Sequence, residues 1–383
     1  MSEAVESSEP CRATLAQLAD RLHETLGTRS YGAEDAVLFV DSDMLEDLHG
    51  SARDVDSEIP GVYWVDRLVT GNDWWTVGKT PSERGVRRYT LYAVKGGVGR
   101  STSAAALAYY LADQGEHVMV LDLDLESPGL SVGLLDPRKQ PRYGIVDWFV
   151  EDLVGQGDHV VEAMAGLAWD NDFDGDVLIV PAHGADPGEY LAKLGRVYLD
   201  TDIPWTARLR CLLEKLEERH RPSIVLLESR SGLHDIAAAT VTDLNAQVLL
   251  FAVDADSHWS DYSVLFRHWQ KQGLATEIRD RLSIVSALTP EQEAKQYLRG
   301  FQERSWSLFR DHLYDEVRPK HSGDPFSFDL GDNDAPHSPI PIYWTRGLAA
   351  GASLRNVGLP LAYLDFLSVI KQMIDDDGGR GSN

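Results

Sequence analysis

A glycine-rich run between an apolar segment and a helical segment constrains the fold of this sequence most strongly. Residues 95–101 read KGGVGRS; they follow the apolar segment YTLYAV (89–94) and lead into STSAAALAYYLADQ (101–114). Glycines let the backbone turn tightly and point consecutive N–H groups at an anion, and the helix N-terminus adds its positive dipole end. The order strand, glycine loop, helix therefore predicts a phosphate-binding loop, the alternative being a tight turn that binds nothing.

From residue 88 onward, apolar segments alternate with helical patterns. Segments that are apolar on both faces and separated by helices indicate a mainly parallel sheet covered on both sides. We expect a three-layer α/β fold, with a helix at 206–220 and strands at 89–94, 117–124, 176–182, 223–228, 247–255, 282–288 and 338–344.

The ends of the chain are expected to differ from this α/β domain. Residues 1–84 predict a small N-terminal α/β extension of unknown role, with a helix at 12–26 and strands at 36–41 and 61–68. Residues 85–375 form the main domain, and the polar, glycine-rich residues 376–383 predict a disordered tail. Trp74 and Trp75 are expected to pack in the interior rather than to mark a binding surface.

Composition excludes several classes of function. The formal charge is −25, and only nine of the 36 basic residues are lysine, so we expect no strong binding to nucleic acid. Arg84, Arg87 and Arg88 are the densest basic cluster, and we interpret them as a solvated linker. No apolar run is long enough to span a membrane, the first residues are acidic, and there are two cysteines. These features indicate a cytoplasmic protein without a disulfide framework or a cysteine-ligated metal.

Four segments together resemble one protein family. Lys95–Ser101 resembles the deviant Walker A motif of the ParA/MinD group of P-loop ATPases, whose usual form is KGGxGK followed by Thr or Ser. The similarity continues in VMVLDLDLESPGLS (118–131), DVLIVPAHGADPGEYLAKL (176–194) and SIVLLESRSGLHD (223–235), and covers about residues 88–370. It implies a P-loop NTPase fold with ATP and Mg²⁺ as cofactors.

The resemblance assigns roles to the loop residues. Lys95 would be the signature lysine that reaches the partner's phosphates in an ATP-bound homodimer. Arg100 stands where the family has the lysine that holds the β- and γ-phosphates. Arginine keeps the charge and can hydrogen-bond phosphate, but it is bulkier, so we expect binding to survive with altered geometry and slow turnover. The residues expected to contact the nucleotide are Lys95, Gly96, Gly97, Val98, Gly99, Arg100, Ser101 and Thr102.

Carboxylates complete the expected site. By the same resemblance, Asp124 orients the attacking water, while Ser101, Asp122 and Glu228 belong to the Mg²⁺ shell. Glu228 departs from the usual aspartate of this position, although its longer side chain can still hold a Mg²⁺-bound water. The alternative for the two aspartates is strand-end capping. Residues 229–235 (SRSGLHD) would be the switch segment that senses the γ-phosphate.

Two departures from the family restrict the functional assignment. The family often has an asparagine for base recognition where this sequence has Ser286 and Ala287, so no residue is assigned to the base. The changes at Arg100 and Glu228 also leave two functions open: an ATPase that dimerises with ATP and separates after hydrolysis, and a hydrolysis-poor nucleotide-binding scaffold or sensor.

Branches of the family can be compared with this chain. Its acidity argues against a DNA-partitioning ATPase, and the C-terminal segment 359–379, with one lysine, predicts a core-packing helix rather than a membrane anchor. Electron-transfer relatives need cysteines that bind a cluster, and this chain has only two cysteines. Bacterial tyrosine kinases of the family need a tyrosine-rich tail, and the last residues, GGRGSN, contain no tyrosine. A cytoplasmic regulatory ATPase with an unidentified protein partner remains, by analogy alone.

Overall fold

The computed structural model describes residues 9–27, 72–75, 77–78, 85–168, 173–198, 203–316, 325–346 and 360–380. Contacts divide the chain into two units, residues 1–69 and 70–383. In the first unit, α2 (Glu9–Leu26) includes the helix predicted at 12–26. The strands expected at 36–41 and 61–68 lie outside the described residues.

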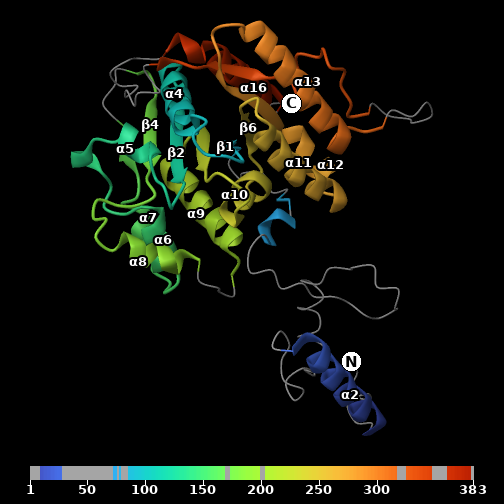
Figure 1. Cartoon of the computed structure of the whole chain (residues 1–383). Helices are drawn as coiled ribbons and strands as arrows, with labels where there is room; N and C mark the ends of the chain where they lie inside the picture. Colours follow the sequence, from blue (N-terminus) through green and yellow to red (C-terminus); the bar gives the residue numbers. More distant parts are fainter. Residues whose placement is uncertain are drawn as a thin grey trace. The chain divides into compact units, whose positions relative to one another are not determined.

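The second unit is built on an eight-stranded sheet (Figure 1). All paired strands are parallel except β3, which runs antiparallel to β4, so the predicted, mainly parallel sheet is confirmed. In spatial order the strands are β3 (Gly166–Leu167), β4 (Asp176–Val180), β2 (His117–Leu123), β5 (Ile224–Ser229), β1 (Arg87–Tyr92), β6 (Gln247–Ala252), β7 (Leu282–Thr289) and β8 (Ile340–Tyr343).

Helices cover both faces of this sheet. On one face, apolar side chains of β1, β2, β5 and β6 pack against α4 (Arg100–Asp113), α5 (Leu130–Leu134) and α16 (Leu364–Arg380). The face is apolar because alternate residues of each buried strand point to it, as Tyr89 and Leu91 of β1 do. The C-terminal segment therefore packs in the core, as predicted, through Phe366, Leu367 and Ile370.

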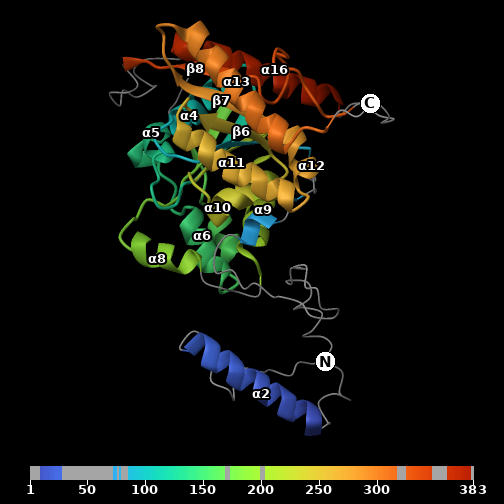
Figure 2. The same cartoon turned by 45° about the vertical axis from the view of Figure 1, so that its right-hand side comes forward.

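The opposite face is covered by two groups of helices, which remain grouped in both views (Figures 1 and 2). Over β2 and β5 lie α6 (Ile145–Asp152), α7 (Gly157–Val161), α9 (Trp205–His220) and α10 (Asp235–Ala238), with α8 (Tyr190–Val197) packed beside α6. Over β6 and β7 lie α11 (Asp256–Lys271), α12 (Ala275–Ile278) and α13 (Ala294–His312). A π-helical turn, Ala239–Asp243, follows α10. Every helix in the described residues is too short or too polar to span a bilayer.

The segments that flank the sheet show one confirmation and one correction. Trp74, in the short helix Asn72–Trp75, is 5% exposed and its ring lies 6.1 Å from those of Tyr92 and Trp269, so it packs in the interior as expected. At the other end, α16 continues to Arg380, so residues 376–380 are helical rather than part of a disordered tail. A helix that is already packed extends at low cost, because each added residue gains one hydrogen bond.

The strand order places several strand ends beside one another. Strand β1 lies between β5 and β6, and β2 lies on the far side of β5. In parallel sheets all carboxyl ends meet at one edge, where ligands of open α/β folds bind. The carboxyl ends of β1, β2 and β5 and the loops that follow them therefore converge, and they carry the residues singled out in the sequence.

Candidate functional site

The glycine loop connects β1 to α4 with two residues in the left-handed region. Gly97 has φ 78° and Gly99 has φ 81°, a backbone geometry that side-chain-bearing residues rarely adopt. Gly99 is the N-cap of α4 and provides no side-chain cap, so the first N–H groups of the helix have no capping side chain. A Cβ built on Gly97 would meet no heavy atom of the described residues within 4 Å. The loop has the open, donor-rich form that an anion requires.

Arg100 is the first residue of α4, and its side chain lies inside the protein. The residue is 7% exposed, and its guanidinium donates a hydrogen bond to the Ser229 carbonyl oxygen. Its other terminal nitrogen lies 3.6 Å from Asp124 Oδ2. Arg100 therefore connects the start of α4 with the loop after β2 and with the last residue of β5. To bind a phosphate, it would have to use its remaining donors or exchange one of these partners.

Ser101 links the loop to the end of β5. Its hydroxyl donates to Oε1 of Glu228, a side chain that is 1% exposed. Burial, followed by the negative charge of Asp122, raises the pKa of Glu228 to about 8. A carboxyl group with so high a pKa resists ionisation until a cation arrives nearby.

Asp122 lies beside Glu228 because the two residues are register partners on β2 and β5. Asp122 is fully buried, and its Oδ2 accepts hydrogen bonds of 3.3 Å from the backbone N–H and the hydroxyl of Ser131. Burial raises the pKa of Asp122 to about 6, although the bonds from Ser131 oppose the change. The strand-end position was expected, and Ser131 explains how a buried carboxylate is held there.

Asp124 lies two residues further along and is less buried than Asp122. Burial raises the pKa of Asp124, while the charge of Arg100 opposes that rise. A carboxylate that is partly exposed beside a cation can accept a hydrogen bond from a water molecule. Its position next to Arg100 brings together two of the three residues, Lys95, Arg100 and Asp124, that the sequence analysis expects to act in catalysis.

Two carboxylate oxygens in this centre have no hydrogen-bond partner among the described residues. They are Asp122 Oδ1 and Glu228 Oε2, both buried. Buried acceptors without partners are costly, which is a reason to expect a ligand for them. Mg²⁺ binds one or two carboxylates together with phosphate oxygens and waters, so Ser101, Asp122 and Glu228 fit it. No cluster of three or more His, Cys, Asp or Glu side chains suited to a metal occurs in the described parts of the chain.

The side chain of Lys95 contacts α11, whereas that of Arg100 contacts Ser229 and Asp124. Its Nζ lies 2.5 Å from Asp261 Oδ2, on α11, and the two side chains are 45% and 32% exposed. The charge of Lys95 also reaches His258, whose pKa is lowered first by burial and then by that charge. Lys95 is thus accessible at the rim of the loop, paired within its own chain.

The segment 229–235 is tied to β1 and to the glycine loop by its backbone. Gly232 donates its N–H to the Ala93 carbonyl at 3.0 Å, and the Tyr92 hydroxyl donates to the Gly232 carbonyl at 3.0 Å. The Ser229 hydroxyl accepts a 2.8 Å hydrogen bond from Thr240, in the π-helical turn. Together with the hydrogen bond from Arg100 to the Ser229 carbonyl, these bonds join the segment to the glycine loop and to the end of β1.

The end of β7 does not present a side chain for the base at the expected positions. Ser286 and Ala287 are both fully buried, and the Ser286 hydroxyl is bonded to that of Thr289 at 2.8 Å. Base recognition stays unassigned.

The structure adds residues that the sequence did not single out. Ser131 belongs to segment 118–131, so the sequence could have indicated its hydroxyl as a partner for Asp122. The Ser229 carbonyl is a backbone group, and the sequence gave no indication of its contact with Arg100. Asp261 lies far along the chain in an ordinary amphipathic helix, and nothing in the sequence connected it with Lys95.

Comparison with known proteins gives a family match. Residues 89–258 match the model of the CobQ/CobB/MinD/ParA nucleotide binding domain. The matched range contains the glycine loop, Asp122, Asp124 and Glu228. A search of curated protein sequences finds no match.

Three solved structures are similar to this chain. A putative plasmid partition protein from Borrelia burgdorferi bound to AMPPNP is 13% identical; the alignment covers 75% of this chain and 99% of that chain, with a TM-score of 0.47. The MinD cell division protein of Aquifex aeolicus is 13% identical, with 76% and 98% covered and a TM-score of 0.46. MinD of Pyrococcus horikoshii complexed with Mg-ADP is 22% identical, with 54% and 71% covered and a TM-score of 0.38.

Proposed function

We propose an ATP-dependent switch from one premise: residues 89–258 of this chain form a nucleotide-binding domain of the CobQ/CobB/MinD/ParA family. In this proposal, loop 95–101 holds the phosphates of ATP, and Ser101, Asp122 and Glu228 hold Mg²⁺. The ion neutralises phosphate charge when bound, and Asp124 orients the attacking water. The observation that carries the proposal is the direct contact of the loop hydroxyl, Ser101, with Glu228, which stands in register with Asp122.

The switch would act through association of two chains. Lys95 resembles the signature lysine of ParA/MinD ATPases, and its half-exposed position at the rim of the loop leaves it accessible to a second copy. ATP would favour the homodimer, and hydrolysis would separate it. By analogy with the family, we place the protein in a regulatory, cytoplasmic system with a protein partner, which co-purification would identify.

A hydrolysis-poor scaffold is the second candidate, and Arg100 favours it. Its guanidinium already donates to the Ser229 carbonyl and lies beside Asp124, so phosphate binding competes with contacts inside the protein. Slow or absent turnover would follow from that competition.

Phosphate release from ATP by the purified protein tests the two candidates. The switch ATPase predicts release that needs Mg²⁺ and disappears in Asp124→Ala. Saturable ATP binding without phosphate release above background, in wild type as in Asp124→Ala, would support the scaffold instead. Absence of ATP binding would overturn both.

A further inference from the structure

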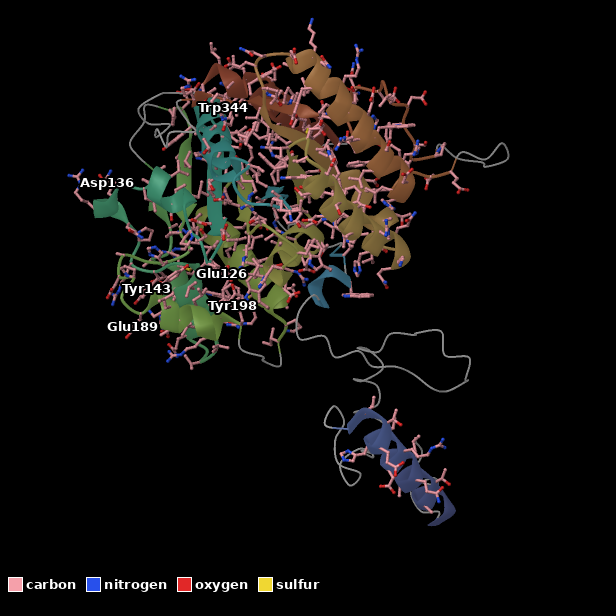
Figure 3. The ribbon with its side chains drawn as sticks, viewed as in Figure 1. Glu126, Asp136, Tyr143, Glu189, Tyr198 and Trp344 are labelled. Carbon is pink, nitrogen blue, oxygen red and sulfur yellow. The ribbon has the colours of Figure 1, made fainter. Side chains whose placement is uncertain are left out.

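Arg230 is a charged residue of the segment 229–235, and the site described above, formed by the glycine loop and the carboxylates, assigns it no role. It stands two residues after Glu228, and its NH1 donates to Glu126 Oε1 at 2.6 Å. The same oxygen accepts a 2.6 Å hydrogen bond from the Tyr198 hydroxyl, at the end of α8. Figure 3 shows Glu126 and Tyr198 close together. Among the described residues, the second oxygen, Glu126 Oε2, is buried without a partner.

The charge of Arg230 reaches the carboxylate centre. Burial raises the pKa of Asp124, and the charge of Arg230 opposes that rise, as the charge of Arg100 does more strongly. Asp124 therefore stands in the field of two arginines, one from the glycine loop and one from the switch segment. Arg230 is 29% exposed and Glu126 is 25% exposed, so this ion pair is only partly screened by water.

The backbone of the segment keeps Arg230 near the loop independently of Glu126. The Ser229 carbonyl accepts from Arg100, and Gly232 is bonded to Ala93 and Tyr92. Both neighbours of residues 230–231 are thus anchored to the loop or to β1. The side chain of Arg230 can exchange its partner without displacement of the segment as a whole.

We propose that Arg230 is a second phosphate-binding cation of this site, and that Glu126 is the positioning residue that holds it when no nucleotide is bound. The proposal rests on the proposed nucleotide function and specifies how the site distinguishes ATP from ADP. In a phosphate loop, the cation at the position of Arg100 reaches the β- and γ-phosphates, so the terminal phosphate lies toward Asp124 and the switch segment. A guanidinium pairs with phosphate as well as with carboxylate.

The exchange favours ATP because ADP lacks the phosphate that would replace Glu126. When Arg230 moves to the γ-phosphate, the Tyr198 hydroxyl still donates to Glu126, so the carboxylate keeps a partner. Glu126 therefore competes with ATP for Arg230 and sets the threshold at which the segment responds. A ligand shifts such an equilibrium only through its differential affinity for the two states.

Calorimetric affinities for AMPPNP and ADP, both with Mg²⁺, test this proposal. Arg230→Ala is expected to weaken AMPPNP binding about tenfold or more, because it removes a charged hydrogen bond, and to change ADP binding by less than about threefold. Arg230→Lys is expected to retain part of the preference. Glu126→Gln is expected to tighten AMPPNP binding and leave ADP unchanged. Arg196→Ala, an exposed arginine on α8, controls for loss of one positive charge.

The double variant Glu126→Gln/Arg230→Ala decides whether Glu126 acts through Arg230. If it does, the Glu126 substitution has no effect on AMPPNP affinity once Arg230 is absent. Equal weakening of AMPPNP and ADP by Arg230→Ala, or tightening by Glu126→Gln in the Arg230→Ala background, would overturn the proposal. A wild-type protein that binds neither nucleotide would overturn the proposed function itself, an outcome distinct from these. Thermal unfolding of each variant verifies that it is folded.

Discussion

Asp122 and Glu228 are register partners on adjacent parallel strands, and both are almost completely buried. Each carries one oxygen that lacks a hydrogen-bond partner among the described residues, and burial raises the pKa of both. Two acids in this arrangement repel each other when ionised, and a divalent cation removes that repulsion. We therefore expect the pair to give the site a stability that depends on pH and on metal.

The pH dependence of stability follows from Glu228. Its pKa rises from 4.5 to about 8 on folding, so its stabilising contribution is complete below pH 4.5 and is lost as the pH rises through 8. Glu228→Gln removes the ionisable group, and we expect it to raise the Tm of the nucleotide-free protein by several degrees at pH 8.5, at about 2–4 °C per kcal/mol. The gain should shrink toward pH 5. A gain that is the same at both pH values would contradict the assigned burial of this charge.

Metal binding should show the opposite dependence on pH: it should strengthen as the pH rises, whereas the stability of the nucleotide-free protein falls. Mg²⁺ with nucleotide requires the ionised carboxylates, so binding is expected to release protons and to strengthen as the pH rises from 6 to 8. Calorimetry in two buffers of different ionisation enthalpy measures the released protons. In Glu228→Gln the release should fall; an unchanged release would locate the proton elsewhere.

Gly97 tests the loop itself. Gly97→Leu is expected to abolish ATP binding, since a side chain there would occupy the path of the phosphates. It should cost the fold only about 1–2 kcal/mol for the left-handed backbone, because no heavy atom of the described residues lies within 4 Å of a Cβ at this position. Gly115→Leu, at a position with φ 84° and equally without close neighbours, is the matched control. ATP binding that survives in the Gly97 variant would contradict the loop assignment.

Lys95 and Asp124 should separate association from hydrolysis. Lys95→Ala is expected to keep some nucleotide binding and to weaken both ATP-induced association and hydrolysis, because this lysine would link two chains through the phosphates. Asp124→Ala should bind ATP and associate, while hydrolysis stalls. Light scattering with ATP distinguishes the variants. A wild-type protein that stays monomeric with ATP and with AMPPNP would contradict the dimer.

Asp261 provides a sharper test of the same lysine. It pairs with Lys95 at 2.5 Å within one chain. If Lys95 must leave Asp261 to reach a partner, Asp261→Asn should shift ATP-induced association to lower protein concentration, by a few-fold for a half-exposed pair. Asp256→Asn, on the same helix and paired with Arg304, serves as the control. An association equilibrium that does not move would exclude this competition.

The parts of the site that the sequence predicted are those set by local pattern. Strand β1, the glycine loop and α4 follow from one continuous run, and Asp122 and Glu228 both end apolar segments, so the parallel sheet brings them together. The aspartates lie at strand ends and the Ser101 hydroxyl contacts Glu228, while the assignment of these residues to a Mg²⁺ shell stays a prediction.

The contacts that the sequence could not predict join residues far apart in the chain. Arg100 meets the Ser229 carbonyl across 129 positions, and a backbone oxygen leaves no compositional trace. Lys95 meets Asp261 only because α11 packs over β6, beside β1. At the C-terminus, composition predicted disorder where α16 continues to Arg380, because the packing of its earlier turns outweighs the low helix propensity of the terminal glycines.

Calorimetric titration of the unaltered protein with ATP, in the presence of Mg²⁺ and again with the metal chelated, tests the central claim most directly. The nucleotide site formed by the glycine loop and the carboxylates predicts saturable binding at one site per chain, which is strongly weakened when Mg²⁺ is removed. No saturable binding of ATP with Mg²⁺ present would contradict it.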